Sequence, residues 1–294
     1  MSARHPIIAV TGSSGAGTST ARRVFERLFD RLGVNAAYVE GDSFHAYDRE
    51  QMGSAIERAR IRGENFSHFG PGANHLDKLE QLFRAYSETG TGMARRYLHT
   101  ETEAIAAGQS VGTFTPWAPL PTDSDLLLYE GLHGGVVTNE VDVAQHVDLL
   151  IGVTPTVNLE WIQKIRRDAD ERGHTPKDVT RTILRRMPDY VKFITPQFSR
   201  TDINFQRVPL VDTSNPFVIR DIPKPEESLV VVHLAPNSRV KLDMAPLCDQ
   251  IPNVSMTRPD TLIVPGAHMG QAMELILEPA IRQQLSRRMA VLEG

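Results

Sequence analysis

The sequence lacks three features that would point to other classes of protein. It has one cysteine, Cys248, so an intrachain disulfide, a dithiol redox switch and a cysteine-rich zinc site are excluded. No apolar run approaches the roughly 18 residues of a membrane span, and the start MSARHPIIAV is too short of apolar residues for a signal peptide. Basic residues are not in excess either, because the net charge is -4. We therefore expect a cytoplasmic protein that acts on neither nucleic acid nor membranes.

What is present fits a folded α/β protein. The 294 residues suffice for one large α/β domain or two small ones, and a hydrophobic share of 40% is ample for a core. Short apolar β-runs alternate with helical stretches, which predicts a mixed, mostly parallel sheet with helices on both faces. Because no repeat or low-complexity linker interrupts this order, we expect a single domain over residues 1–294.

A glycine-rich stretch, TGSSGAGTS at residues 11–19, follows a strand-like run and leads into a helical pattern at 18–32. Such a turn lets main-chain N–H groups point at phosphate oxygens, and the helix N-terminus adds partial positive charge. This order predicts a P-loop NTPase-like fold, with Ser19 at the position of a magnesium-binding hydroxyl. The expected nucleotide-binding residues are Gly12, Ser13, Ser14, Gly15, Ala16, Gly17, Thr18, Ser19 and Thr20.

The loop departs from the Walker pattern because Thr18 stands where a lysine is expected. Either another element supplies that cation or the loop binds no nucleotide. A helical stretch after the strand-like run 147–154 has charged residues on one face, and Asn158 is its expected cap. The residues of this face are Lys164, Arg167, Asp168 and Arg172. They fit a salt-bridged surface helix, or a lid helix in which Lys164 replaces the loop lysine.

Charged residues also follow the strand-like run 36–41. Asp42 comes directly after it, at the sheet edge of the glycine loop, and His45 and Arg49 lie just beyond. Since ligands of open α/β sheets bind at the carboxyl ends of strands, these residues fit an acceptor-substrate pocket, or a helix cap with solvated neighbours. Tyr97 and His99, beside two arginines, fit either a sugar-phosphate site or a solvated strand.

The run DLLLYE at 125–130 has the form of a Walker B strand. Its apolar residues carry Glu130 to the phosphate edge of the sheet, where a carboxylate can hold Mg²⁺ directly or through water. Further along, the pattern predicts a helix at 175–193 with a proline in its first turn. It also predicts strands at 208–211, 229–234 and 262–264, and a closing helix at 269–292 that is interrupted near Pro279.

With these residues in place, the chain resembles the phosphoribulokinase family in its shorter bacterial form. The matching stretches are GSSGAGTST at 12–20, EGDSFH at 40–45, FSHF at 66–69, YEGLHG at 129–134, NLEWIQKI at 158–165 and TDINFQRVPLVDTSNPF at 201–217. KIRRDADERGHT at 164–175 looks like the family signature, although Lys177 stands where the pattern ends in glutamate. Uridine kinase has a similar lid, whereas the Thr18 loop together with TDINFQR is far more specific.

The resemblance implies phosphorylation of ribulose 5-phosphate to ribulose 1,5-bisphosphate in the Calvin cycle, with ATP and Mg²⁺. It implies that Asp42 is the general base on the C1 hydroxyl, that Glu130 is the Walker B acid and that Asp168 is a second essential carboxylate on Mg-ATP. The cations that it places on phosphates are Lys164 and Arg167. The residues that it places on ribulose 5-phosphate are His45, Arg49, His99 and Arg172.

Regulation and assembly are also implied by the resemblance. Bacterial members are commonly activated by NADH, inhibited by AMP and assembled into large homo-oligomers, often octamers. Arg31 and Arg258 stand where effector-binding arginines are expected, whereas His233 stands where another arginine would be. A thioredoxin-reducible disulfide like that of plant relatives is excluded, because the loop has Ala16 in that region and the chain has one cysteine.

Two other functions remain open from the sequence. One is another P-loop small-molecule kinase, such as a uridine kinase, which assays with uridine would reveal. The other is a non-catalytic nucleotide sensor, which Thr18 favours but the three carboxylates Asp42, Glu130 and Asp168 do not, because a sensor needs no general base. A signalling GTPase would need an NKxD motif, which the chain lacks.

Overall fold

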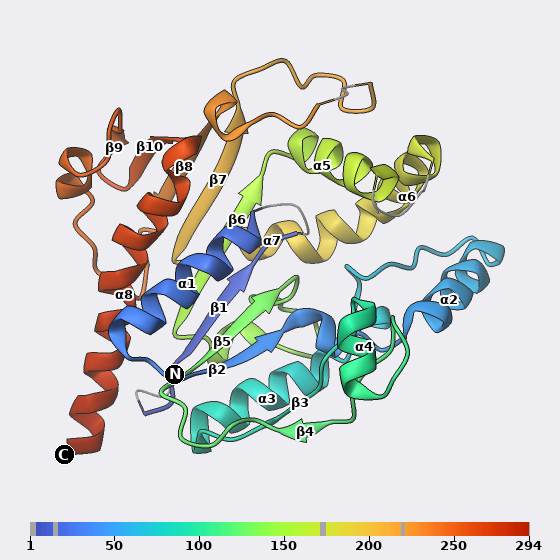
Figure 1. The fold of residues 1–294 in the computed structure, drawn as a ribbon, viewed down its shortest axis with the longest axis horizontal. Helices are drawn as coiled ribbons and strands as arrows, with labels where there is room; N and C mark the ends of the chain where they lie inside the picture. The colour runs from blue at the N-terminus through green and yellow to red at the C-terminus, as the bar shows by residue number, and fades with distance from the viewer. Residues whose placement is uncertain (1–3, 14–16, 171–174, 219–220, 294) are drawn as a thin grey trace.

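A computed structural model describes residues 4–13, 17–170, 175–218 and 221–293. Within this part, eight strands form one sheet in the order β2-β5-β1-β6-β7-β8-β10-β9 (Figure 1). The pairs from β2 to β7 are parallel, and those from β7 to β9 are antiparallel. The strands are β1 Ile7–Thr11, β2 Ala36–Glu40, β5 Leu126–Gly131, β6 Leu149–Pro155, β7 Ile203–Pro209, β8 Ser228–Leu234, β9 Ser255–Arg258 and β10 Thr261–Pro265. A separate ribbon pairs β3 Met93–Ala94 with β4 Ala118–Pro119.

Helices cover both faces of the sheet, as the sequence pattern predicts (Figure 1). Alternate residues of β1 point to opposite faces: Ile8 and Val10 pack with α1 and α8, whereas Ile7 and Ala9 pack with α3. The helices are α1 Thr18–Leu32, α2 Arg49–Ile61, α3 Leu76–Thr89, α4 Glu101–Ala107, α5 Val157–Asp170, α6 Pro176–Asp189, α7 Thr195–Phe198 and α8 Met269–Glu293. No helix of the described residues is both long and apolar enough to cross a membrane.

The carboxyl ends of the parallel strands meet at one edge of the sheet. There β1 leads into the glycine loop, β2 into a 3-10 turn at Gly41–Phe44, and β6 into α5. The helices α2, α4, α5 and α6 gather on this side of the molecule (Figure 1). The topology therefore brings the predicted phosphate and acceptor residues to one side, as expected for an open α/β sheet.

The strand predicted at 208–211 and the interruption predicted near Pro279 were wrong, and one strand of the main sheet was not predicted. The strand predicted at 208–211 is β7, which begins at Ile203, because Ile203 and Phe205 are buried between β6 and β8. The closing helix α8 is continuous through Pro279, since it buries Ile276 and Ile281 on the sheet and this offsets the local cost of about 3 kcal/mol. β9 was not predicted at all.

The predicted cap of α5 was also wrong. Asn158 is the second residue of the helix rather than the residue before it. Its Nδ2 donates to the carbonyl of Thr213, 2.9 Å away, and so ties the start of α5 to the segment that follows β7. The helix predicted at 175–193 ends as α6 at Asp189 and passes into a π-helical turn, Tyr190–Ile194.

Candidate active site

The glycine loop leaves β1 at the carboxyl edge of the sheet. The main-chain N–H of Gly12 donates to the carbonyl of Gly131 on β5, 3.3 Å away. Gly17 directly precedes α1 with a φ of +103°, which glycine adopts without strain, and its carbonyl accepts from the N–H of Thr20 at 2.9 Å. The predicted groups that lie outside the described part of the structure are Ser14, Gly15, Ala16 and the side chains of Thr18 and Ser19.

The start of α1 is suited to bind an anion. Gly17 has no side chain that could cap the helix, and the first turn carries no acidic residue. The first N–H groups of a helix have no acceptor within the helix, and they carry partial positive charge. The hydroxyl of Ser13 is buried and has no hydrogen-bond partner among the described atoms. Phosphate oxygens would supply acceptors for all these donors.

Asp42 lies in the 3-10 turn that follows β2. This turn passes close to β5: a Cβ on Gly41 would lie 2.6 Å from the Tyr129 hydroxyl, so only glycine fits there. Two imidazoles face the two Asp42 oxygens, with His45 Nε2 at 3.2 Å from Oδ1 and His99 Nε2 at 3.6 Å from Oδ2. The Asp42 side chain is 42% exposed, which leaves the carboxylate accessible to a substrate.

The electrostatic surroundings keep Asp42 ionised. Burial alone would raise its pKa, but the hydrogen bond and charge of His45, followed by the charge of His99, lower the pKa of Asp42 to about 2. Burial alone would likewise lower the pKa of His45, but the hydrogen bond and charge of Asp42 raise it. The surroundings therefore favour an ionised Asp42, and the Asp42 carboxylate in turn favours the charged form of His45.

The segment before α4 completes this acceptor cluster. The Tyr97 ring lies edge-on to His45 at 6.3 Å and to His99 at 4.8 Å between ring centroids. Arg95 does not face a substrate, because it donates to the main-chain carbonyls of Ser43 at 2.9 Å and His45 at 2.6 Å. It also covers the rings of Phe114 and Trp117, which follow α4, and so holds the 3-10 turn in place.

Arg49 has a different environment from the other predicted acceptor residues. It is the first residue of α2, and its N–H donates to the Gly112 carbonyl at 2.9 Å. Its side chain is exposed and runs along Gly112, so close that a Cβ on Gly112 would lie 2.9 Å from Arg49 Nε. The described contacts of Arg49 are thus with Gly112 rather than with Asp42. The other remaining acceptor residue, Arg172, lies outside the described residues.

Glu130 lies near the end of β5, where the Walker B pattern predicts it. It is in register with Val10 on β1 and Glu40 on β2, and its carboxylate accepts from the Tyr38 hydroxyl at 2.8 Å. Burial, together with the charge of Glu130, raises the pKa of Tyr38, so the phenol stays protonated and donates. The other oxygen of the Glu130 carboxylate accepts no hydrogen bond from the described residues and can take a cation or water.

The charged face of α5 is largely shielded from solvent. Lys164 Nζ lies 2.6 Å from Asp168 Oδ2, and Arg167 Nε lies 3.4 Å from Asp168 Oδ1. These side chains are 16%, 24% and 8% exposed for Lys164, Arg167 and Asp168, so they do not form an ordinary surface salt-bridge array. Burial, followed by the charge of Arg186, lowers the pKa of Lys164, while Asp168 opposes that change.

A further buried carboxylate, Glu160, lies one helical turn before Lys164. The Tyr190 hydroxyl donates to Glu160 Oε2 at 3.0 Å and thereby joins α5 to the π-helical turn. Burial raises the pKa of Glu160, whereas the nearby Ser13 and Tyr190 hydroxyls act to lower it. Ser13 is thus close to this carboxylate without making a hydrogen bond of normal geometry among the described residues.

Arg186 on α6 acts electrostatically on both the acceptor cluster and the charged face of α5. Its charge lowers the pKa of both His45 and Lys164, so it is close to each. Neither Arg186 nor Glu160 was predicted as a site residue. The signal for Glu160 was a carboxylate at i−4 from Lys164, whereas nothing in the helical pattern of α6 distinguished Arg186 from its neighbouring cations.

Residues 7–214 match the family model described as phosphoribulokinase / uridine kinase family. The chain belongs to this family. The plasmid-encoded phosphoribulokinase of Cupriavidus necator is 56% identical over 289 residues, which cover 98% of each chain. A probable phosphoribulokinase of Escherichia coli is 54% identical over 283 residues, which cover 96% of this chain and 97% of that one. The solved structure of a phosphoribulokinase from Rhodobacter spheroides has a TM-score of 0.89 at 47% identity and covers 98% of this chain and 100% of its own.

These comparisons confirm the predicted family and the P-loop kinase fold with its mostly parallel sheet. Similarity to kinases over the whole length also confirms that the chain is a kinase. The nucleotide-sensor alternative receives no support from relatives that match end to end and are named as enzymes. The roles of single site residues remain predictions.

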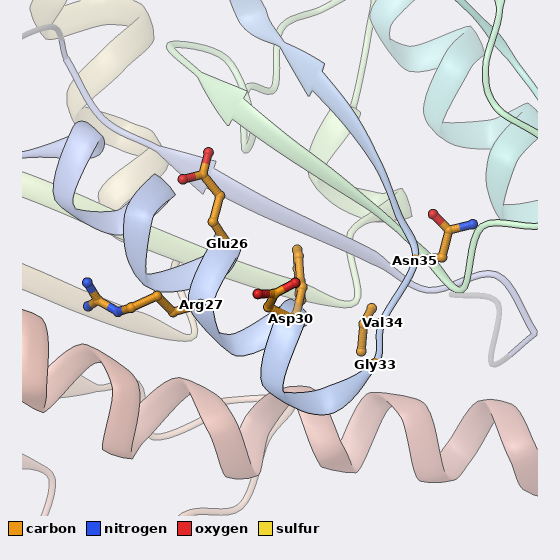
Figure 2. A pocket seen from close by; sticks show the side chains of 7 residues that line it. Glu26, Arg27, Asp30, Gly33, Val34 and Asn35 are labelled. Carbon is orange, nitrogen blue, oxygen red and sulfur yellow. The ribbon is translucent and has the colours of Figure 1, made fainter.

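The predicted effector residues of this family member lie away from the site. Arg31 on α1 forms ion pairs with Glu274 and Glu278 on α8. Arg258 is exposed at the end of β9, and His233 Nε2 lies 3.8 Å from the carboxylate of Asp260. A hollow between the end of α1 and the start of β2 also lies at the edge opposite to the glycine loop (Figure 2). An effector role for the two arginines remains a prediction.

Proposed function

We propose that this protein is a phosphoribulokinase, which transfers the γ-phosphoryl group of ATP to the C1 hydroxyl of ribulose 5-phosphate and forms ribulose 1,5-bisphosphate for the Calvin cycle. Its relatives of 56% and 54% identity are named for that activity, or as probable carriers of it. The observation that carries the proposal is the Asp42 carboxylate, which is accessible and lies between two imidazoles at the sheet edge of the glycine loop. Such a group can accept the proton of a primary alcohol beside a bound phosphate chain.

Asp42 is the general base of this proposal. Phosphoryl transfer depends on positioning and charge neutralisation, so proton removal from the C1 hydroxyl can accompany the transfer. The hydrogen bond from His45 orients the carboxylate, and the second oxygen, 3.6 Å from His99, is the one more available to the alcohol. The groups that we assign to ribulose 5-phosphate are His45, Arg49, Tyr97, His99 and Arg172, since imidazole and guanidinium donors suit a phosphate dianion.

ATP is the donor in this proposal, and its phosphates face the glycine loop and the start of α1. Gly12 and Gly17 provide the described backbone turn, and we assign residues 13–16 and 18–20 to the same nucleotide site. Lys164 and Arg167 supply the cations that Thr18 does not. Lys164 is paired with Asp168, and its ammonium group has further N–H donors that can bind a phosphate when the nucleotide is present.

Magnesium fits this arrangement as a partner of the nucleotide rather than as an ion held by protein alone. No group of three histidine, cysteine or carboxylate side chains in the described residues is arranged to hold a metal ion. Mg²⁺ is commonly held by one or two carboxylates together with substrate phosphates. We assign it to Glu130 and Asp168, with the Ser19 hydroxyl; when bound, it neutralises charge on the transferred phosphate.

The wider setting follows from the same proposal. We propose that residues 1–294 form one kinase domain, because β8 and β10 extend the sheet that carries the site. We place the enzyme in the cytoplasm, where ATP is available, as a homo-oligomer, with an octamer as the expected size. NADH and AMP are the effectors to test, with Arg31 and Arg258 as candidate contacts.

The test is release of ADP from ATP and Mg²⁺ with ribulose 5-phosphate, uridine or pantothenate as acceptor. Each acceptor is assayed with and without NADH. We expect turnover with ribulose 5-phosphate and formation of the bisphosphate. Turnover with uridine alone would assign the chain to the uridine kinase branch of the family and overturn the proposal.

A further inference from the structure

Both ring nitrogens of His45 face hydrogen-bond acceptors. Nε2 lies 3.2 Å from Asp42 Oδ1, and Nδ1 lies 2.8 Å from the Asn74 side-chain oxygen Oδ1. The ring is buried, with 7% of the residue exposed. A neutral imidazole carries one N–H and therefore can satisfy only one of two such acceptors, whereas an imidazolium can satisfy both.

The orientation of the Asn74 amide is fixed by its own contacts. Its Nδ2 donates to the main-chain carbonyls of His68 at 2.8 Å and Gly70 at 2.7 Å. The reversed amide would set its oxygen against both carbonyls and turn its NH₂ group toward His45, which loses two hydrogen bonds. The oxygen therefore faces His45, and because a carbonyl oxygen only accepts, Nδ1 of His45 carries a hydrogen.

We propose that Asn74 is a positioning residue that selects the doubly protonated, positively charged form of His45. Nδ1–H of His45 donates to Asn74, Nε2–H donates to Asp42, and the positive charge of the ring pairs with the Asp42 carboxylate. Asn74 is thereby responsible for a fixed positive charge at the acceptor pocket and for the orientation of the Asp42 carboxylate. The part that concerns the acceptor rests on the proposed function, whereas the protonation of His45 does not.

The groups around His45 make this selection necessary. The neutral His68 ring lies against it, tilted by 35° with centroids 4.3 Å apart, and the charge of Arg186 on α6 acts on it. The other titratable groups that face the pair are Tyr97, His99 and His133, and Arg95 donates to the main-chain carbonyl of His45. Burial and Arg186 disfavour a charged His45, so the two acceptors, Asp42 and Asn74, must outweigh them.

The neighbouring histidines do not compete for this proton. Burial, followed by the charge of His45, lowers the pKa of His68 to about 3. Burial lowers the pKa of His133 to about 4, and its Nε2 lies 3.0 Å from the Phe69 carbonyl. Both rings therefore stay neutral at physiological pH, and the charge of the cluster resides on His45.

The experiment is a titration of His45 by NMR on protein labelled at histidine Cε1, without substrates. The signal of His45 is the one that disappears in His45→Asn. Asn74→Leu keeps the shape but removes the acceptor, and Asn74→Asp adds a negative charge. Both variants lose the two Nδ2 donors, and Asn74→Asp also sets a carboxylate oxygen against the carbonyls of His68 and Gly70, so it disturbs the loop at least as much as Asn74→Leu. A rise of the His45 pKa in Asn74→Asp therefore reports the charge that faces Nδ1. Asn65→Asp, at an exposed position of the same loop, is the control for a nearby charge.

We expect His45 of the unaltered protein to be protonated at pH 7, with its pKa lowered by about one unit or more in Asn74→Leu and raised in Asn74→Asp. Asn65→Asp should leave it within about 0.3 unit. In turnover assays at neutral pH, Asn74→Leu should raise KM for ribulose 5-phosphate about tenfold with little change in KM for ATP.

Several results would overturn the inference. A pKa of His45 below its ordinary value of about 6.5 in the unaltered protein would do so without any variant. Shifts of the same sign in Asn74→Leu and Asn74→Asp would mean that loop loosening, not the Nδ1 contact, moves the proton. If Asn74→Leu does not fold, the rise in Asn74→Asp decides the matter. Absence of ribulose 5-phosphate turnover with the expected titration intact would refute the proposed function and leave the role of Asn74 standing.

Discussion

Replacing Asp42 by asparagine keeps the size of the side chain and removes the charge that faces His45 and His99. Asparagine can still accept a hydrogen bond from His45, so the 3-10 turn has no reason to rearrange. What it cannot do is take the proton of an alcohol. If Asp42 is the general base, kcat should fall by at least about 10²-fold, which corresponds to about 2.7 kcal/mol of transition-state stabilisation.

The structure sets the rest of the expected result. The 3-10 turn and the glycine loop leave different strands, so KM for ATP should stay within about threefold. The pKa of Asp42 is lowered to about 2, so its protonation does not limit turnover at any ordinary assay pH. The residual activity of the variant should therefore lack the contribution of a base at every pH from about 5 to 8.

The assay couples ADP release to ribulose 5-phosphate turnover, with Asp77→Asn as the matched control. Asp77 lies in the first turn of α3 and is exposed, so its replacement removes a carboxylate of the same kind away from the site. The control should keep near-normal kcat. If Asp42→Asn folds, binds ATP and turns over at a near-normal rate, Asp42 is not the base and the assignment of the acceptor cluster fails.

Three further predictions address the role of Lys164, the close packing of the 3-10 turn at Gly41, and the pH dependence of stability. Lys164→Met should lower kcat or raise KM for ATP at least tenfold, measured against Arg166→Met on a more exposed face of the same helix; no change in either constant would show that Lys164 does not replace the loop lysine. Gly41→Ala should destabilise the protein by about 1–3 kcal/mol in urea unfolding, because a Cβ there would lie 2.8 Å from main chain of β5, while Gly53→Ala, in an open helical position, should be stabilising. Burial raises the pKa of Asp148 to about 6 in the folded protein, above its value of about 3.9 in the unfolded chain. The folded state therefore binds the proton more tightly, and the stability gained from this is fully present below about pH 3.9 and is lost as the pH rises through about 6. Asp148→Asn should thus be more stable than the unaltered protein by about 1–3 kcal/mol at pH 8 and lose that advantage at pH 4; equal unfolding free energies at both pH values would contradict it.

The sequence was most informative where function depends on short stretches of chain. The order of β1, glycine loop and α1, and the positions of Asp42 and Glu130 after their strands, follow from local periodicity and glycine placement. Parallel strands of one sheet then bring these short stretches together without any further information. The comparisons agree with the family that those stretches indicate.

The unpredicted features arise from contacts between distant parts of the chain. Asn74 lies 29 residues beyond His45, and its amide is oriented by carbonyls of its own loop. Nothing in the residue types of α6 predicts that the charge of Arg186 acts on both His45 and Lys164. Likewise, burial on both sides sets the start of β7, and packing on the sheet carries α8 through its proline. Long-range packing and hydrogen bonds of this kind outweigh local secondary-structure propensity, which is worth at most a few kcal/mol for a single residue.

The same long-range contacts connect the two halves of the site. The loop that carries His68 is held to α6, where Ser67 donates to Asp189 at 2.7 Å and the Phe69 ring packs edge-on against Tyr190 at 5.6 Å. Tyr190 in turn donates to Glu160, one turn before Lys164 on α5. Because His68 stacks on His45, a movement of α5 and α6 toward bound phosphates must either carry this loop with it or break these contacts. A continuous set of contacts therefore joins α5 and α6 to the loop beside His45, so a displacement of α5 on nucleotide binding would have a direct packing route to the acceptor cluster.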